Sequence, residues 1–407
     1  MIEDKRILLG VTGGIAAYKA AFLASRLTQA GALVDVIMTP GAERFVTPLT
    51  FQGVSGRPVH DDVFGSLPDG RIAHVNLAKG ADLLIVAPLT AHTLARLALG
   101  LADDLLTVTA LACTAPLLLA PAMEEHMWQH PATQANLETL RRRGAFIVGP
   151  LSGHLASGAS GVGRMAEPDD LLGAARYLLG RGGPLAGHRV VITAGGTHEA
   201  LDPVRFIGNR SSGKMGVALA QAALDLGADV VLIHGPLAVA APWGVQTMAI
   251  ESAQQMCDVV LAQMPATDVL IGAAAVADFR PAVMAAQKIK KQPDDAGLTI
   301  ELVRNPDILA HVADQRSLSG RPRVTVGFAA ETENLYANAQ AKLAAKGLDL
   351  IVANDVTASD AGFGVDTNRV TLLSPNSPPE PLPLMSKAAA AAAIMQRVAA
   401  LLNHPSL

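Results

Sequence analysis

The chain has 407 residues, half of them hydrophobic and 17% charged, with a formal net charge of −4. This length suits two or three domains with sizeable cores, and the small negative charge excludes a basic field for nucleic acid. The chain has only two cysteines, Cys113 and Cys257, which are too few and too far apart in sequence for a disulfide framework. The first ten residues, MIEDKRILLG, lack the hydrophobic region of a secretory signal, so we expect a cytoplasmic protein.

Short apolar runs in the first half predict strands that begin at Arg6, Leu33, Leu83, Pro116 and Ala145. The turn TGGIAAYKA follows the first run and leads into a helical pattern that ends at Ala30. Residues 105–123 are uncharged and long enough for a membrane helix. Their threonines and Pro116 instead favour a helix followed by a strand, so no membrane segment is expected.

The second half repeats this order after GRGGPLAG, residues 180–187, whose glycine and proline content indicates a boundary. RVVIT precedes a glycine turn and a helix, and further strands are expected from Asp229, Asp268, Arg323, Asp349 and Asn368. The alanine-rich segment 386–403 is helical by propensity. We therefore predict two α/β domains, residues 1–187 and 188–407, with parallel sheets covered on both faces.

Glycines and hydroxyls follow two strands of the first half. Gly13 and Gly14 allow close backbone approach to a ligand at a helix N-terminus, which favours an anion. Thr90 and Thr93 also lie at a strand end, where open α/β sheets bind ligands. A plain tight turn and ordinary helix caps explain these residues nearly as well. His74, a lone histidine, is more often structural.

The second half carries polar residues suited to phosphate. In NRSSGKMG, residues Asn209 and Ser211 to Gly213 form an anion-binding pattern at a helix start, although a serine-capped helix is the simpler interpretation. Asp278 suits Mg²⁺ bound with a triphosphate. Lys342 and Lys346 are four residues apart and share one helix face. Such lysines commonly serve solubility alone.

Several motifs carry a family resemblance. GVTGGIAAYKA, RIAHVNLAK, APLTAHTLARLALGLADDLLT, APAMEEHMW and GVGRMAEP resemble the flavin-dependent decarboxylases of cysteine derivatives, and the second half resembles their fused ligase partner. Nearly the whole chain is thus similar to the bifunctional phosphopantothenoylcysteine decarboxylase/phosphopantothenate–cysteine ligase family. The resemblance implies a flavodoxin-like flavoprotein domain of the cysteine-decarboxylase (HFCD) type and a Rossmann-like ligase domain. It also implies His74 as the catalytic base and FMN held by Gly13, Gly14, Thr39, Thr90 and Thr93.

Two residues depart from the family pattern in the first half. Glu124 stands where the family has an asparagine that donates to the substrate carboxylate, and Ser157 where it has a cysteine proton donor. An ionised glutamate only accepts hydrogen bonds, and at an effective dielectric of about 20 it repels a nearby carboxylate by about 4 kcal/mol. Burial would have to raise its pKa to restore a donor. Either this half binds FMN and decarboxylates poorly, or neighbouring groups compensate.

The resemblance further implies that CTP activates 4′-phosphopantothenate as an acyl-cytidylate, which the amine of L-cysteine attacks. Lys288 would stabilise charge in the first step, Asn209 would act on the intermediate, and Asp278 would hold Mg²⁺. The nucleotide positions implied are Gly272, Ala273, Ala274, Asp278, Lys288, Pro306, Asp307, Ile308, Leu309, Phe328, Lys342 and Lys346. Flavoprotein trimers and ligase dimers would form a homo-oligomer. The alternatives are a flavoprotein half that acts on another thiol, or one that serves as an oligomerisation scaffold or regulatory subunit.

Overall fold

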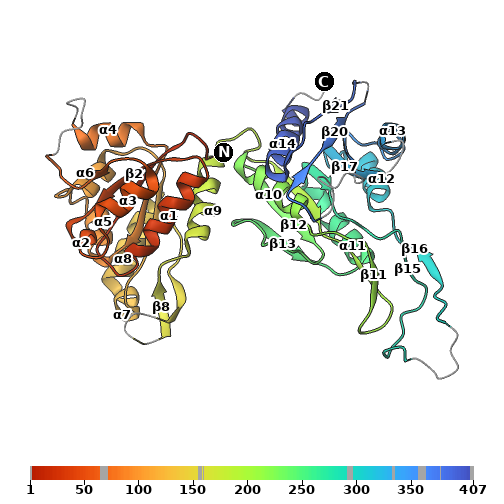
Figure 1. The fold of residues 1–407 in the computed structure, drawn as a ribbon, viewed down its shortest axis with the longest axis horizontal. Coiled ribbons are helices and arrows are strands. Elements are labelled where there is room, and N and C mark those ends of the chain that lie inside the picture. Colours follow the sequence, from red (N-terminus) through yellow and green to blue (C-terminus); the bar gives the residue numbers. More distant parts are fainter. Residues whose placement is uncertain are drawn as a thin grey trace. The chain divides into compact units, whose positions relative to one another are not determined.

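A computed structural model describes residues 2–64, 72–154, 158, 160–290, 297–331, 335–355, 364–375 and 377–403. The chain divides into two compact units, residues 1–179 and 180–407, each built around its own sheet (Figure 1). The glycine-rich segment 180–187, which the sequence marks as a boundary, belongs to the second unit. There the backbone N–H of Leu185 donates to the carbonyl of Leu226 at 2.8 Å.

The first unit is a doubly wound α/β layer around a six-stranded sheet in the order β3-β2-β1-β4-β5-β6, in which every pair is parallel. A separate antiparallel hairpin joins β7 to β8. The strands are β1 Arg6–Val11, β2 Leu33–Met38, β3 Val59–His60, β4 Leu83–Leu89, β5 Leu117–Pro121, β6 Phe146–Ile147, β7 Leu151–His154 and β8 Ser160–Arg164. The helices are α1 Ala17–Gln29, α2 Pro40–Glu43, α3 Pro48–Ser55, α4 Ala73–Gly80, α5 Ala91–Leu99, α6 Leu105–Ala112, α7 Glu125–Gln129, α8 Pro131–Arg142 and α9 Pro168–Gly180.

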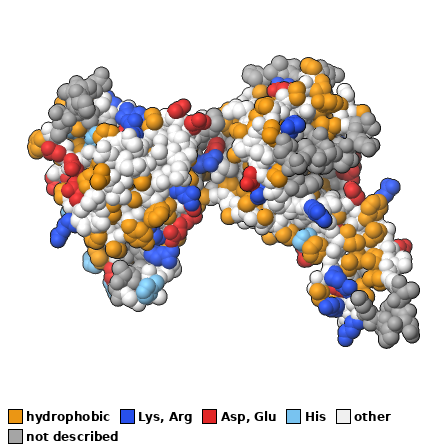
Figure 2. Space-filling view, viewed as in Figure 1, with side chains coloured by type: hydrophobic (Ala, Val, Ile, Leu, Met, Phe, Trp, Pro, Cys, Tyr) orange, Lys and Arg blue, Asp and Glu red, His pale blue; other side chains and the backbone are white. Residues whose placement is uncertain are grey.

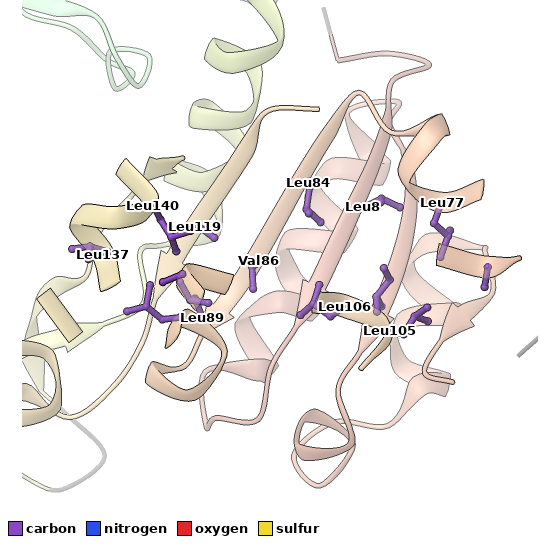
Figure 3. Close-up of a cluster of buried hydrophobic side chains, with 14 residues drawn as sticks. Leu8, Leu77, Leu84, Val86, Leu89, Leu105, Leu106, Leu119, Leu137 and Leu140 are labelled. Atoms are coloured by element: carbon purple, nitrogen blue, oxygen red, sulfur yellow. The ribbon is translucent and has the colours of Figure 1, made fainter. Parts of the chain in front are cut away.

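The core of this unit lies between the sheet and the helices that cover it. Every residue of β4 is buried, as expected for a parallel strand covered on both faces. Leu8 and Leu84 of the sheet cluster with Leu105 and Leu106 of α6 (Figure 3). The prediction for residues 105–123 is confirmed, because α6 is followed by β5. Among the described residues, no helix is long and apolar enough to cross a membrane.

The second unit has an eight-stranded sheet in the order β13-β12-β9-β14-β17-β18-β20-β21. Its strands are β9 Arg189–Ala194, β12 Asp229–His234, β13 Gln246–Ala249, β14 Val269–Gly272, β17 Val324–Glu331, β18 Leu350–Asp355, β20 Val370–Leu373 and β21 Glu380–Pro381. Two-stranded pairs join β10 His198–Ala200 to β11 Phe206–Gly208, β15 Phe279–Pro281 to β16 Leu302–Arg304, and β19 Thr367–Asn368 to β22 Met385–Ser386. The helices are α10 Lys214–Asp225, α11 Ala253–Gln263, the 3-10 turn η1 Met264–Ala266, α12 Ile308–Ser319, α13 Leu335–Ala345 and α14 Lys387–Asn403.

Two expectations for this unit need correction. The sheet is not wholly parallel, because β20 runs antiparallel to β18 and β21 antiparallel to β20. Antiparallel strands often complete the edge of a parallel sheet. The apolar run DVLIGAAAVADF, residues 268–279, favours one long strand. In the structure β14 ends at Gly272, and the small residues after it form a loop. The C-terminal helix is confirmed as α14, which packs on α10 and buries Ala390, Ile394 and Val398.

Both sheets contain a point where the strand order reverses. In the first unit it lies between β1 and β4, and in the second between β9 and β14. The connections from these neighbouring strands leave in opposite directions, which opens a crevice at their carboxyl ends. The candidate sites lie at these two places.

Candidate active sites

A cavity of about 830 Å³ lies at the β1/β4 crevice of the first unit. It is lined by Gly13, Gly14, Ile15, Ala16, Tyr18, Lys19, Thr90, Ala91, Ala122, Met123, Glu124, Met127, His154, Gly158, Gly163, Arg164, Met165 and Glu167. The hydroxyl of Thr12 joins the loops after the two strands. It donates to the carbonyl of Pro88 at 2.7 Å and accepts from the backbone N–H of Thr90 at 3.1 Å.

The glycine turn is closely packed on its outer side. A Cβ on Gly13 would lie 2.7 Å from the carbonyl carbon of Gly41, so no larger residue fits without a backbone shift. Thr39 caps α2, accepting from the N–H of Ala42 at 3.3 Å, and thereby positions Gly41. Thr39 does not itself line the cavity. Its role here is to support the turn.

The two threonines after β4 take different positions. Thr90 lines the cavity, whereas Thr93 is 2% exposed and does not. The hydroxyl of Thr90 accepts from the N–H of Thr93 at 3.4 Å and caps α5. Thr93 therefore holds Thr90 in place.

A charged trio that the sequence analysis missed lines the same cavity. Glu167 binds Lys19 Nζ at 2.9 Å and the guanidinium of Arg164 at 2.5 Å. The hydrogen bond from Lys19 is the main reason that the pKa of Glu167 lies below its ordinary value. Lys19 stands in TGGIAAYKA and Glu167 in GRMAEP, so both motifs contained the signal, but 148 residues separate them.

Glu124 lines the cavity as an ionised helix cap. Its Oε2 accepts from the backbone N–H groups of His126 at 2.7 Å and Met127 at 3.2 Å, and its Oε1 lies 2.8 Å from His126 Nδ1. The bond with His126 is the first cause of a lowered Glu124 pKa. Burial therefore does not raise the pKa of Glu124 and keep it protonated, because the side chain is only partly buried and its oxygens accept hydrogen bonds from His126 and Met127.

Glu125 has a structural role beside it. Its Oε1 accepts from the backbone N–H of Val162 at 3.4 Å, and its carboxylate packs against Gly161, where no Cβ would fit. It therefore braces β8 against α7. Of the two carboxylates, only Glu124 lines the cavity.

Of the two other residues expected in this site, His74 lies apart from the cavity. His74 lies on α4 and is not among the residues that line the cavity. Its Nδ1 is buried and has no hydrogen-bond partner within the described part of the chain. Ser157 lies outside the described residues. His154, which the sequence analysis did not single out, does line the cavity.

A second cavity, of about 490 Å³, lies at the β9/β14 crevice of the second unit. Of the implied nucleotide positions, ten line it: Gly272, Ala274, Asp278, Pro306, Asp307, Ile308, Leu309, Phe328, Lys342 and Lys346. Ala273, Asn209 and Lys288 do not. The remaining lining residues are Thr193, Leu270, Val276, Ala277, Phe279, Arg304 and Asn305.

Charged groups of both signs face this cavity. Lys342 donates to the carbonyl of Phe328 at 2.8 Å, and Lys346 lies 3.0 Å from the Asp307 carboxylate. Burial is the largest single effect on Asp307 and opposes its ionisation, but the hydrogen bonds from Lys346 and the backbone of Ala310, together with the charges of Lys346 and Lys342, leave its pKa below the ordinary value. Asp278 is exposed at the cavity surface. The cavity thus offers lysines for phosphate and carboxylates for a metal ion.

Asn209 lies at the edge of this cavity, whereas Lys288 lies outside it. Asn209 Nδ2 donates to the carbonyl of Val276, a lining residue, at 2.9 Å. Lys288 is exposed on the segment after β15, where the N–H of Ile289 donates to Asp202 Oδ2 at 3.1 Å. Arg205 bonds both the Asp202 carboxylate and the Ile289 carbonyl. Lys288 does not line the cavity of its own chain, because these bonds hold its segment against Asp202 and Arg205.

Comparison with known proteins covers both units. Residues 1–179 match the family described as Flavoprotein, and residues 185–402 match the DNA/pantothenate metabolism flavoprotein C-terminal domain. The chain is 48% identical over 403 residues to the coenzyme A biosynthesis bifunctional protein CoaBC of Vibrio vulnificus strain YJ016, covering 99% of each chain. It is also 48% identical over 404 residues to the protein of that name from Bacillus subtilis strain 168, covering 98% of each.

Two solved structures resemble one unit each. The C-terminal domain of a CoaBC protein matches with 38% identity and a TM-score of 0.46, over 54% of this chain and 98% of that one. A cysteine-to-serine mutant of a PPC decarboxylase, complexed with pantothenoylaminoethenethiol, matches with 33% identity and a TM-score of 0.39, over 43% of this chain and 97% of that one.

Proposed function

The chain belongs to the CoaBC family of bifunctional coenzyme A biosynthesis proteins, and on that premise we propose that its two units catalyse consecutive reactions. The second unit joins 4′-phosphopantothenate to L-cysteine with CTP, and the first removes CO₂ from the product. The observation that carries this proposal is the presence of two separate cavities at two strand-order reversals, one lined by a glycine turn and one by lysines and carboxylates.

In the ligase unit the charges around the second cavity support activation of a carboxylate. A carboxylate is a poor acyl donor, and its transfer to the α-phosphate of CTP, with loss of pyrophosphate, gives it a leaving group. Lys342 and Lys346 would hold the phosphates as charge shifts between their oxygens. Asn209, at the edge, would contact the acyl-cytidylate, whose carbonyl carbon the cysteine amine attacks to release CMP.

Magnesium fits this cavity as a partner of the nucleotide. The described residues hold no group of three or more metal-ligating side chains, which argues against a metal cage made by protein alone. Mg²⁺ is commonly bound by one or two carboxylates together with substrate phosphates. Asp278, which is exposed at the cavity surface, supplies such a carboxylate.

FMN fits the first cavity. The packed turn at Gly13 leaves backbone rather than side chain facing the ligand, and α1 begins directly after it, which suits a phosphate. Gly13, Gly14 and Thr90 would hold the phosphate, with Thr39 and Thr93 behind them. When bound, FMN supplies the oxidation of the cysteine moiety that makes loss of CO₂ feasible and the later reduction of the enethiol.

We further propose a homo-oligomer, with trimers of the first unit and dimers of the second. His74 does not line the cavity of its own copy, and its buried Nδ1 has no partner among the residues that the structure describes, so as catalytic base it would serve another copy. Ile15, just before α1, and Tyr18 and Phe22 on α1 are more than half exposed. Hydrophobic side chains also gather over the β15–β16 hairpin of the second unit (Figure 2), where Phe279 and Leu302 are exposed. A second ligase unit there would supply Lys288.

The cytoplasm suits this role, because Cys113 and Cys257 are free thiols. The test is to supply the purified protein with phosphopantothenate, cysteine, CTP and Mg²⁺ and to follow pyrophosphate and CO₂ separately. We expect pyrophosphate only when CTP is present, and CO₂ after the ligation product accumulates. Ligation without CO₂ from flavin-loaded protein would show that the first unit acts as a scaffold or on another thiol.

A further inference from the structure

The wall of the first cavity that contains Glu124 poses an electrostatic problem for the proposed decarboxylation. The substrate carries a carboxylate, and an ionised Glu124 in the cavity wall repels it. Lys19 and Arg164 line the same cavity, and both are bound to the single carboxylate of Glu167, which leaves these three groups with a net charge of +1. The printed partners of Glu124 are groups of His126 and Met127 and not Lys19 or Arg164, so the charge of Glu124 has to be met by a nearer group.

His126 is the group that meets this need. Both oxygens of Glu124 are occupied, Oε2 by two backbone N–H groups and Oε1 by His126 Nδ1 at 2.8 Å. A carboxylate on Nδ1 fixes the ring orientation and the position of that proton, which leaves Nε2 for a ligand. The side chain of His126 is 90% exposed. Protonated, it cancels the charge of Glu124 and presents an N–H donor.

His126 is not itself among the residues that line the first cavity, but its chain neighbours Glu124 and Met127 are. We propose that His126, oriented by Glu124, binds the carboxylate of the substrate's cysteine moiety at the edge of this cavity. His126 is then a substrate-binding residue and Glu124 a positioning residue. This inference rests on the proposed decarboxylation. It explains how a cavity with a glutamate in its wall accepts an acid. Histidine side chains are visible on the surface at the α7 end of this unit (Figure 2).

The charges around His126 favour its protonated form. On its own helix, Glu124 is the first cause and Glu125 a smaller cause of a pKa above the ordinary 6.5. On the neighbouring elements, Arg164 of β8 is paired with Glu167, and Glu138 of α8 is paired with Arg141. Because the raised pKa belongs to a cation, the imidazolium is complete at low pH and is lost as pH rises through that pKa. Affinity for the acid should therefore fall toward alkaline pH.

The test measures how His126→Ala changes the binding of the substrate acid, phosphopantothenoylcysteine, and of the product, phosphopantetheine, relative to the wild type. At pH 7 we expect KM for phosphopantothenoylcysteine to rise about tenfold or more, the size of a charge-assisted hydrogen bond, and to lose its alkaline increase. Phosphopantetheine, which lacks the carboxylate, should inhibit the wild type and the variant equally. Gln129→Ala, an exposed change on the same helix, should leave KM unchanged. Flavin absorbance should not change in either variant.

A second variant separates recognition from local structure. Glu124→Asn removes the repelling charge and places an amide donor in the wall, so adding His126→Ala to it should raise KM little. A persistent alkaline rise of KM in His126→Ala, or an equal loss of phosphopantetheine binding, would overturn the inference. Calorimetric binding of the acid to the holoprotein measures the same difference without turnover. A wild type that binds the acid through His126 but releases no CO₂ would contradict only the proposed reaction.

Discussion

The two units share a strand order but treat charge differently in their cavities. In the first unit, each charged side chain that lines the cavity has a side-chain partner, since Glu167 pairs with both Lys19 and Arg164, and Glu124 pairs with His126. In the second, Lys342 reaches a backbone carbonyl, Lys346 pairs with Asp307, and Asp278 is exposed. The same scaffold thus presents a largely charge-compensated cavity in one unit and a charged one in the other. The loops after the strands decide the chemistry, which is why fold alone does not assign function.

The largest expected effect comes from Lys288→Gln, which should abolish CTP-dependent pyrophosphate release while leaving flavin content unchanged. Lys288 does not line the second cavity of its own copy, and in the proposed dimer the other copy would supply its charge. Mixed oligomers of Lys288→Gln with Asp278→Asn should regain part of the activity, because one interface then combines an intact cavity with an intact Lys288. Persistent pyrophosphate release in Lys288→Gln would remove this residue from the site.

Gly13→Ala tests whether the glycine turn of the first cavity binds FMN. The new Cβ would meet the backbone of Gly41, so the turn must shift and FMN should be lost from purified protein by about tenfold or more. The absorbance ratio of flavin to protein measures this. Ligation should stay at the wild-type rate, since the two cavities lie in different units. Full flavin content in this variant would contradict the placement of the phosphate at this turn.

Lys346→Met should raise KM for CTP about tenfold, because it removes a phosphate partner and leaves Asp307 unpaired. The double variant with Asp307→Asn should recover part of that loss, since the repelling charge disappears and asparagine still caps α12. Steady-state kinetics at fixed phosphopantothenate distinguishes the two. Equal KM values in the single and double variants would show that the ion pair does not face the nucleotide.

The smallest effect concerns the anchor of the Lys288 segment. Asp202 is 2% exposed, and its hydrogen bond with Arg205 is the first cause of a strongly lowered pKa. Because the pKa of Asp202 is lower in the folded protein than its ordinary value of 3.8, the ionised carboxylate stabilises the fold at pH values above about 3.8. This contribution is lost as the pH falls below that value. Asp202→Asn should lower Tm by a few degrees at pH 7, with a gap that narrows below pH of about 4. Asp229→Asn, an exposed carboxylate, is the control and should change Tm little.

Much of the fold follows from patterns that the sequence displays. The long apolar strands, such as β1, β4 and β9, are continuous because both faces are buried, and each was predicted from that run. The short hairpins were not predicted. LSGH, SGVGR and HEA carry neither an apolar run nor clear alternation, and their positions depend on tertiary contacts.

The candidate sites were predictable where a residue type and a strand end coincide, as at Gly13, Thr90 and Asp278. Long-range partners were not predictable. The bond between Lys19 and Glu167 joins residues far apart in the sequence, and the anchor of Lys288 depends on the buried side chain of Asp202. Glu124 shows a third limit, since the sequence does not reveal that its own helix would occupy both carboxylate oxygens.

The segment that precedes β9 determines where the ligase half can be separated from the rest of the protein. Leu185 is fully buried, and a Cβ on Gly183 would lie only 2.6 Å from the carbonyl carbon of Leu226. A fragment that starts at the apparent linker's end, residue 188, would therefore lose part of its own core and expose apolar surface. An independently folding ligase fragment should begin at residue 180.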